Sequence, residues 1–270
     1  MNEQTQNTAD QSTGTARGAV VTGATTGIGQ ATAREMARRG WRVYAVGRRA
    51  ERLQTLADDV AADTSATGSL IPVALDVTDA DAVARLVEQV SAEGGVDTVL
   101  NIAGGARGTD PVGTGEIEQW EWMYRANVLG TLTMCKAFLP MLRTHGEGTI
   151  LNLTSTAAIT AYEGGAGYNA AKMGQHGLTG ALRLEEAEHN VRVIEVLPGM
   201  VHTEEFALMR MGGDRTAADK VYAGVAKPLT AEDVAEVCVH AVELPHHVNL
   251  DQIVLRPVAQ AAQHKVIRRG

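Results

Sequence analysis

The chain has 270 residues, 44% of them hydrophobic, which is enough to bury one sizeable core in a single α/β domain. Its formal net charge of −8 argues against nucleic acid as the main partner, because phosphate binding needs clustered Lys and Arg. No apolar run approaches the ~18 residues that span a bilayer, so no membrane association is expected.

Residues 1–16 are rich in Thr, Gln and Asn and lack the basic start and apolar stretch of a signal peptide. We interpret them as a disordered tail, because they hold too little apolar surface to offset the entropy lost on ordering. Cys135 and Cys238 stand in apolar, helix-like stretches, which favours two buried thiols over a disulfide. Together these features predict a cytoplasmic protein.

From residue 17 onward, apolar runs alternate with amphipathic stretches. Near-continuous Val, Ile and Leu predict strands covered on both faces, hence a mostly parallel seven-stranded sheet in one doubly wound α/β domain. The predicted strands are Gly18–Thr22, Arg42–Val46, Leu70–Leu75, Thr98–Asn101, Thr149–Leu153, Arg192–Leu197 and Ile253–Leu255. Amphipathic stretches between them include Gly29–Arg39, Ala80–Val90 and Trp120–Leu142. The predicted domain spans residues 17–258, and residues 259–270 are interpreted as a C-terminal tail.

The first predicted strand runs into a glycine-rich turn, Thr22-Gly23-Ala24-Thr25-Thr26-Gly27-Ile28-Gly29. Gly23 is expected to allow the sharp turn, Gly27 to let the backbone approach a pyrophosphate, and Gly29 to permit close helix–strand packing. The following helix N-terminus offers unpaired N–H groups to phosphates. A tight turn without a ligand is the alternative, but the position between strand and helix favours nucleotide binding.

Arg48 and Arg49 follow the second predicted strand. An acidic residue there would select NAD, whereas an Arg accommodates the 2′-phosphate of NADP, so the sequence predicts NADP(H). Two solvated arginines starting a helix are the alternative. After the third predicted strand, Asp76 of Asp76-Val77 could accept from an adenine amino group or cap the next helix.

Ser155, Tyr168 and Lys172 form the candidate reactive cluster. Tyr168 and Lys172 are four residues apart, on one helical face, and a cation lowers the pKa of a nearby phenol by roughly 1 to 3. Tyr168 is therefore the predicted acid/base. Ser155 ends the fifth predicted strand, where its hydroxyl can donate to a carbonyl oxygen, and Asn127 could hold a water in a proton path. A Tyr and Lys four apart is also a common surface pair, but the accompanying motifs favour chemistry.

In this order the motifs resemble the short-chain dehydrogenase/reductase family across residues 17–258. The resemblance implies a Rossmann fold, with Tyr168 as acid/base and Lys172 holding the nicotinamide ribose while tuning Tyr168. It further implies that Ser155 orients the substrate oxygen and that Asn127 supports a proton relay. The residues expected to contact the cofactor are Gly23, Thr25, Gly27, Ile28, Gly29, Arg48, Arg49, Asp76, Val77, Asn101, Ala103, Gly104, Tyr168, Lys172, Pro198, Gly199, Val201 and Thr203. One departure is Ile102, which stands where the family has a second Asn.

Towards the C-terminus, motifs such as Thr203-Glu204-Glu205-Phe206 resemble the branch acting on 3-hydroxy acids, serine and small sulfonated aldehydes. The long segment Gly199–Pro228 is expected to cover the substrate, because ligands lie beyond the carboxyl ends of parallel strands. Arg210 in this segment is the first candidate to bind a substrate anion, together with Ser155 and Tyr168 at the reacting group. Arg107 is the second, and a solvated Arg210 is the alternative.

The sequence thus predicts an NADP-dependent oxidoreductase that interconverts a hydroxyl and a carbonyl on a small acidic substrate. A broad carbonyl reductase for bulkier neutral compounds and a non-catalytic NADP-binding regulator are the alternatives. The resemblance implies a homotetramer, with the helix around Phe138 and the run Val248–Val258 as candidate contacts, although Phe138 could equally lie in the core. Eight histidines lack metal-ligand spacing, so no metal is predicted.

Overall fold

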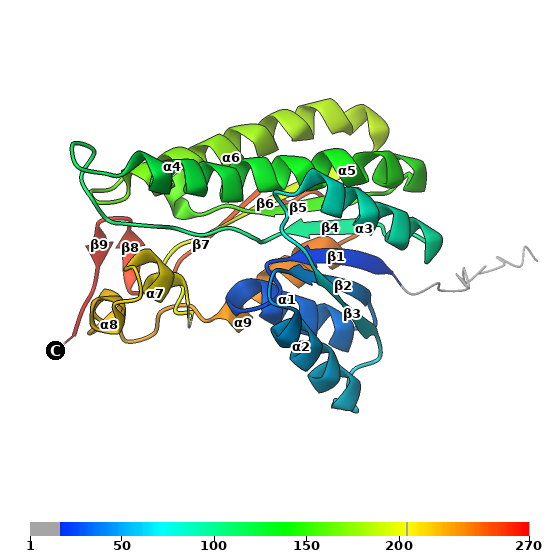
Figure 1. Cartoon of the computed structure of the whole chain (residues 1–270), viewed down its shortest axis with the longest axis horizontal. Coiled ribbons are helices and arrows are strands. Elements are labelled where there is room, and N and C mark those ends of the chain that lie inside the picture. Colours follow the sequence, from blue (N-terminus) through cyan, green and yellow to red (C-terminus); the bar gives the residue numbers. More distant parts are fainter. Residues whose placement is uncertain (1–16, 204, 270) are drawn as a thin grey trace, which may run out of the picture.

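The structure, a computed structural model, describes residues 17–203 and 205–269, so the predicted tail 1–16 lies outside the described residues. Seven parallel strands form one sheet in the order β3-β2-β1-β4-β5-β6-β7 (Figure 1). The strands are β1 (Gly18–Thr22), β2 (Arg42–Gly47), β3 (Ser69–Ala74), β4 (Thr98–Asn101), β5 (Thr149–Leu153), β6 (Arg192–Pro198) and β7 (Gln252–Leu255). The predicted single doubly wound Rossmann fold is confirmed.

Helices cover both faces of this sheet, which is why β1, β4, β5 and β6 are buried along their whole length. On one face lie α1 (Gly27–Arg38), α2 (Ala50–Ala62) and α9 (Ala231–Glu243), and on the other α3 (Ala80–Ala92), α5 (Gly130–His145) and α6 (Ala166–Glu186) (Figure 1). The strand order turns back between β1 and β4. The carboxyl ends of these two strands therefore open the crevice where ligands of such sheets lie.

A separate hydrophobic core fills each side of the sheet. Phe138 and Leu142 of α5 are fully buried in the core shared with α3, so they belong to the interior and not to a subunit contact. Cys135 and Cys238 are buried and unpaired, as predicted, and burial raises the pKa of each thiol to about 12. Across the part of the chain described, no helix has the length and apolarity needed to cross a membrane. The same part of the chain contains no group of three His, Cys, Asp or Glu side chains placed to hold a metal ion.

The single helix predicted over Trp120–Leu142 is interrupted. It consists of α4 (Ile117–Tyr124), a π-helical turn η1 (Arg125–Leu129) and then α5. One wide turn does not disturb the apolar stripe enough to be detected from periodicity, and such turns are frequent at functional sites. Asn127 lies within this turn.

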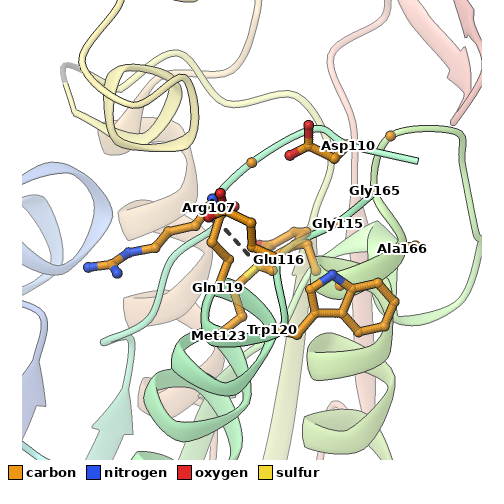
Figure 2. A pocket seen from close by; sticks show the side chains of 13 residues that line it. Arg107, Asp110, Gly115, Glu116, Gln119, Trp120, Met123, Gly165 and Ala166 are labelled. Atoms are coloured by element: carbon orange, nitrogen blue, oxygen red, sulfur yellow. Dashed lines mark hydrogen bonds between the residues drawn. The ribbon is translucent and has the colours of Figure 1, made fainter. Parts of the chain in front are cut away.

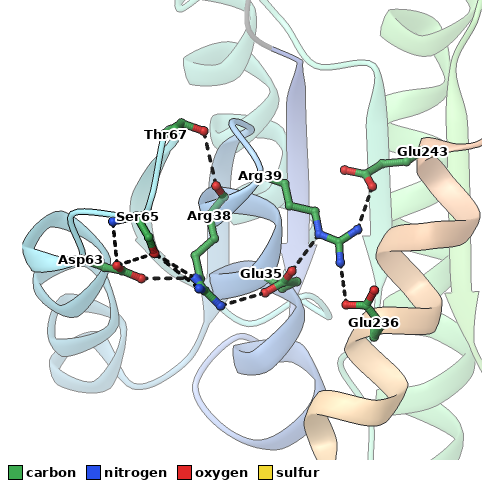
Figure 3. Close-up of polar contacts among 8 residues, drawn as sticks. All are labelled: Glu35, Arg38, Arg39, Asp63, Ser65, Thr67, Glu236 and Glu243. Atoms are coloured by element: carbon green, nitrogen blue, oxygen red, sulfur yellow. Dashed lines mark hydrogen bonds and ion pairs between the residues drawn. The ribbon is translucent and has the colours of Figure 1, made fainter.

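Ion pairs tie α1 to its neighbours (Figure 3). Arg39, directly after α1, pairs with Glu35 at 2.7 Å, with Glu236 of α9 at 2.5 Å and with Glu243 of α9 at 3.0 Å. Hydrogen bonds with Glu236 and Glu35 raise the pKa of the Arg39 guanidinium further above its usual value. One arginine thus holds together the carboxylates of two helices that pack against each other on the same face of the sheet.

The segment after β6 contains α7 (Phe206–Arg210) and α8 (Arg215–Tyr222) and is joined back to the domain by a bridge between Val201 and Leu229. The interpreted C-terminal tail is structured: β8 (Gln260–Ala262) and β9 (Lys265–Val266) form an antiparallel pair. Two short 3₁₀ turns, η2 (Thr156–Ala158) and η3 (Ala187–His189), complete the secondary structure. In Figure 1 the C-terminal strands lie beside α7 and α8.

Candidate active site

The loops after β1 and β4 are joined at the crevice. Thr22, the last residue of β1, accepts hydrogen bonds at Oγ1 from the backbone N–H groups of Ile102 at 2.9 Å and Ala103 at 3.0 Å. Ile102, which stands where the family has a second Asn, therefore keeps a backbone hydrogen bond to Thr22, and its side chain is buried in the core. This junction places the predicted glycine turn beside the predicted cofactor residues Asn101, Ala103 and Gly104.

The glycine turn has the conformation predicted for it. Gly23 has a φ of +72° and Gly27 a φ of +55°, values that side-chain-bearing residues rarely adopt. A Cβ on Gly29 would lie 2.4 Å from the carbonyl oxygen of Gly23, so only glycine permits this helix–turn packing. No side chain caps the start of α1 at Thr26, which leaves backbone N–H groups directed at the crevice.

Two arginines meet at the end of β2. Arg49 donates to Thr25 Oγ1 at 2.9 Å, which attaches its guanidinium to the glycine turn. Arg49 and Arg52 both pair with Glu205, at 2.7 and 2.6 Å. Arg48 is more peripheral: its side chain is 64% exposed and lies 3.9 Å from a carboxylate oxygen of Asp76.

Asp76 does not cap the following helix, so that alternative is wrong. Its Oδ1 accepts from the N–H and hydroxyl of Thr78, at 2.9 and 2.8 Å, and the cap of α3 is Asp79, which accepts from the N–H of Ala82. The neighbouring Val77 is buried and faces Gly130, where an added Cβ would come within 2.8 Å of its side chain.

The reactive trio comes from β5 and α6. Ser155 lies two residues after the end of β5, at the N-cap of the turn η2, and Lys172 Nζ lies 5.8 Å from the ring centroid of Tyr168. Lys172 is buried and donates to the carbonyl oxygen of Leu153 at 3.0 Å and to Gln175 Oε1 at 2.8 Å. Burial lowers the pKa of Lys172 to about 7.

The expected lowering of the pKa of Tyr168 is wrong for this structure. Burial raises the pKa of the Tyr168 phenol above its ordinary value, with a smaller contribution from Tyr162 in the same direction. A hydrogen bond with Ser155 and the charge of Arg210 lower the pKa of Tyr168, but by less than burial raises it. Lys172 does not compensate, because its ammonium is held by neutral acceptors away from the phenol. Tyr168 therefore carries its proton at neutral pH.

Asn127 lies in the π-helical turn η1 and is completely buried. Its Nδ2 donates to the carbonyl oxygens of Met123 at 2.7 Å and Gly105 at 2.9 Å, and its Oδ1 accepts from the N–H of Gly105 at 3.1 Å. A Cβ on Gly104 would lie 2.3 Å from Asn127 Oδ1 and 3.6 Å from Lys172 Nζ. Asn127 thus fixes the loop after β4 against the reactive lysine.

The helix α7 brings Arg210 close to Tyr168, the candidate acid/base. Arg210 donates to the hydroxyl of Tyr162 and to the carbonyl oxygen of Gly164, each at 2.9 Å, and its Cζ lies 6.0 Å from the ring centroid of Tyr168. Phe206, at the other end of α7, packs edge-on against Tyr168 with ring centroids 5.8 Å apart. The alternative of a solvated Arg210 is therefore wrong.

Arg107, the second candidate, lines a pocket beside Tyr168. Its guanidinium stacks 4.0 Å from the ring centroid of Trp122, and Figure 2 shows its side chain extending away from Trp120. This pocket is small and partly open to solvent, and Arg210 is not among the residues that line it. Trp120 and Met123 line it as well.

The residues after β6 also reach the crevice. A Cβ on Gly199 would lie 2.3 Å from Gln260 Oε1. The same oxygen accepts from the N–H of Met200 at 2.7 Å, so the chain that follows Pro198 packs against β8. Thr203 faces the glycine turn, where its Cγ2 lies 3.3 Å from the position of a Cβ on Gly27.

A family model described as short chain dehydrogenase matches residues 17–211. The chain belongs to this short-chain dehydrogenase/reductase family. An uncharacterised oxidoreductase of Mycobacterium tuberculosis is 48% identical over 246 residues, which cover 91% of this chain and 93% of that protein. A sulfoacetaldehyde reductase of Chromohalobacter salexigens is 38% identical over 90% of this chain and 94% of its own. The closed form of a serine dehydrogenase complexed with NADP+ is 34% identical, has a TM-score of 0.85 and covers 94% of this chain and 100% of its own.

As in a short-chain dehydrogenase/reductase, the crevice fits a dinucleotide. The glycine turn and Gly104 have no room for side chains, and the start of α1 presents its N–H groups. Asn101 Nδ2 donates to Asn152 at 2.9 Å, whereas its buried Oδ1 has no hydrogen-bond partner among the described residues. A buried acceptor without a partner can accept a hydrogen bond from a donor group of a bound ligand.

Sequence reasoning missed three residues of this family member's site. Arg52 follows Arg49 by three residues in α2, a spacing that places both side chains on one helical face and could have identified it. Gln175 stands three residues after Lys172 in α6 for the same reason. Glu205 was quoted within a motif, but its contact with α2 spans 156 residues, which no local pattern indicates.

Proposed function

We propose that the protein is an NADP(H)-dependent oxidoreductase that interconverts a hydroxyl and a carbonyl group on a small acidic substrate. The observation that carries this proposal is Arg210, whose guanidinium is held beside Tyr168 by hydrogen bonds to neutral groups alone among the described residues. A half-buried cation with neutral partners favours an anionic ligand. The names of two relatives, a sulfoacetaldehyde reductase and a serine dehydrogenase, support a charged substrate.

The cofactor proposal rests on the arginines after β2. The glycine turn and the start of α1 would hold the pyrophosphate, and Arg49, attached to Thr25, would hold the 2′-phosphate together with Arg52 and Arg48. The serine dehydrogenase of known structure is complexed with NADP+. When bound, the nicotinamide supplies or accepts the hydride.

The chain's own residues would manage the proton. In reduction, the protonated Tyr168 donates to the forming alkoxide oxygen, and Ser155 directs its hydroxyl to the same oxygen. In oxidation, Tyr168 must first lose its own proton, which a positively charged Lys172 with Nζ 5.8 Å from the phenol ring centroid favours, and its phenolate then accepts the proton of the substrate hydroxyl. Asn127 fixes the loop that includes Gly104, and we propose that it supports the proton relay at Lys172.

The segment 199–228 would cover the substrate, because Phe206 and Arg210 of α7 both lie against Tyr168. Trp120 and Met123 would form the apolar wall of the pocket beside it. Arg107 lines the same pocket, so it is the second candidate for the charged end of the substrate.

A substrate panel tests the proposal. NADPH and NADH absorbance would be followed with 3-oxo acids and sulfoacetaldehyde, and NADP+ and NAD+ reduction with serine and 3-hydroxy acids, each beside its neutral ester or alcohol. We expect NADP(H) to be the more efficient cofactor and acidic compounds to exceed their neutral counterparts. Equal efficiency with both cofactors would reject the cofactor proposal, and preference for neutral compounds would indicate a general carbonyl reductase.

We also propose a homotetramer in the cytoplasm. Four large apolar side chains are exposed on α4, η1, α5 and α6, namely Tyr124 at 48%, Leu129 at 39%, Leu132 at 37% and Met173 at 40%. Val254 and Val258, within the predicted contact run Val248–Val258, are exposed as well. Burying such side chains between subunits is favourable, and two reduced thiols suit a reducing compartment. Light scattering giving a mass near that of one 28.5 kDa chain would reject the tetramer.

A further inference from the structure

Glu205 joins the substrate-covering segment to two arginines at the start of α2, Arg49 directly before the helix and Arg52 in its first turn. Its Oε1 is 2.7 Å from Nη1 of Arg49 and 2.6 Å from Nη1 of Arg52, so a single oxygen binds both guanidinium groups. Its side chain is 26% exposed, and the hydrogen bond and charge of Arg49, with the charge of Arg52, hold its pKa below the usual range. The carboxylate is therefore ionised at neutral pH.

A carboxylate between two guanidinium groups offers them an anionic oxygen as hydrogen-bond acceptor. A phosphate monoester offers the same kind of acceptor. Arg49 is also the arginine that donates to Thr25 of the glycine turn, so it lies on the cofactor side of this cluster. Arg48 is not an equivalent substitute, because its guanidinium is 3.9 Å from Asp76 and mostly exposed.

Charge forbids Glu205 and a 2′-phosphate from sharing the two arginines. Arg49 and Arg52 carry two positive charges, and a phosphate monoester carries about −1.5 to −2 at pH 7, which already neutralises them. The charge of Arg48 already faces Asp76 at 3.9 Å, so a third anion at contact distance with Arg49 and Arg52 would be left without a counter-charge and would repel the phosphate. One of the two anions must move away.

We propose that Glu205 is a built-in competitor for the 2′-phosphate of the cofactor and thereby sets how strongly the protein discriminates NADP(H) from NAD(H). This inference rests on the proposed function, because it assigns the arginines at the start of α2 to that phosphate. Binding of the phosphate displaces the Glu205 carboxylate from Arg49 and Arg52. Removing the carboxylate strengthens binding of ligands that carry a 2′-phosphate and leaves ligands without it unchanged.

Two adenosine nucleotides isolate the effect, since adenosine 2′,5′-bisphosphate and 5′-AMP differ only in the 2′-phosphate. Their dissociation constants would be measured by calorimetry for the unmodified protein and for Glu205→Gln. We expect Glu205→Gln to bind the bisphosphate about tenfold more tightly, the scale of one charge-assisted hydrogen bond, and 5′-AMP within about twofold. Glu236→Gln is the matched control. It removes an exposed carboxylate of α9 that pairs with Arg39, and it should change neither dissociation constant.

The outcomes separate this inference from the proposed function. If the unmodified protein prefers the bisphosphate and Glu205→Gln leaves that preference unchanged or weakens it, Glu205 is not a competitor, and the NADP(H) proposal stands. If the unmodified protein binds both nucleotides alike and Glu205→Gln creates a preference, Glu205 competes and the proposed selectivity is wrong. If both proteins bind both nucleotides alike, both proposals are overturned. Glu205→Ala removes the carboxylate without adding an amide. It must give the same result as Glu205→Gln, so that a folding defect in one variant does not decide the outcome.

Discussion

Arg210 donates a 2.9 Å hydrogen bond to the hydroxyl of Tyr162, and this contact fixes the guanidinium over the ring of the reactive Tyr168. The remaining donors of Arg210 reach backbone oxygens of two glycine-containing loops, at Gly108 and Gly164. The charge is thereby held in place by groups that do not neutralise it. A substrate anion beside Tyr168 is the partner such a cation favours.

Replacing Arg210 by Met should selectively impair acidic substrates. We expect kcat/KM for an acidic substrate to fall about 10- to 100-fold, and that for its neutral ester to stay nearly constant, because one charge-assisted pair is lost. Arg107→Met tests the second candidate, which stacks on Trp122 and lines the pocket beside Tyr168, and a loss confined to that variant would assign the anion to Arg107. Parallel losses for acid and ester would show that Arg210 merely supports the two loops.

Tyr168→Phe should abolish turnover while NADPH still binds, because only the hydroxyl is removed from a ring that Phe206 packs against. Proton transfer from a positioned group contributes about 10²- to 10⁴-fold. Single-turnover kinetics and NADPH fluorescence titration measure the two properties separately. Retention of more than roughly a tenth of the activity is incompatible with even the low end of that range.

NADPH binding should take up a proton above neutral pH. Burial lowers the pKa of Lys172 to about 7, so at pH 8 most of the free protein has this amine neutral. The anionic cofactor favours the charged form and raises the pKa, so binding draws in a proton, at most about one. At pH 6 the amine is already protonated and the uptake should vanish. Calorimetry in buffers of different ionisation enthalpy measures it, and Lys172→Met should abolish the uptake at pH 8; its persistence there would assign the proton to another group.

Arg39→Met should destabilise the fold through the contacts shown in Figure 3. Three carboxylates, Glu35, Glu236 and Glu243, would lose their shared cation, and we expect the free energy of unfolding to fall by about 1 to 2 kcal/mol. Arg34→Met breaks one exposed pair with Asp59 and should cost less than about 0.5 kcal/mol. Urea unfolding compares them, and the difference should shrink at 1 M NaCl, where the screening length is about 3 Å. A difference unaffected by salt would indicate lost packing of the Arg39 stem instead.

The strands were predictable because strands that are buried on both faces consist largely of Val, Ile and Leu. Every predicted strand is present, and the largest differences are one residue, as at β2, which continues to Gly47. The glycine turn was predictable for a similar local reason, since positive φ and close packing demand a residue without a Cβ. The π-helical turn at Asn127 was not, because one extra residue per turn barely alters the apolar period.

Long-range charge and solvation were the parts that could not be predicted. The spacing of Tyr168 and Lys172 indicates a shared helical face, yet it says nothing of how much water surrounds the phenol, and burial determines the direction of its pKa. Arg48 and Arg49 looked equivalent in the sequence, but only Arg49 contacts Thr25. The C-terminal strands are short and polar, so no pattern distinguished them from a tail.

Those C-terminal strands have a practical consequence for handling the protein. Gln263 accepts from the hydroxyl of Thr156 at 2.8 Å, next to Ser155, and Arg268 donates to the carbonyl oxygen of Val221 at the end of α8. The last described residues therefore brace both the reactive strand end and the covering segment. An affinity tag or a truncation at this end amounts to an active-site modification, so comparisons of activity between preparations require an unaltered C-terminus.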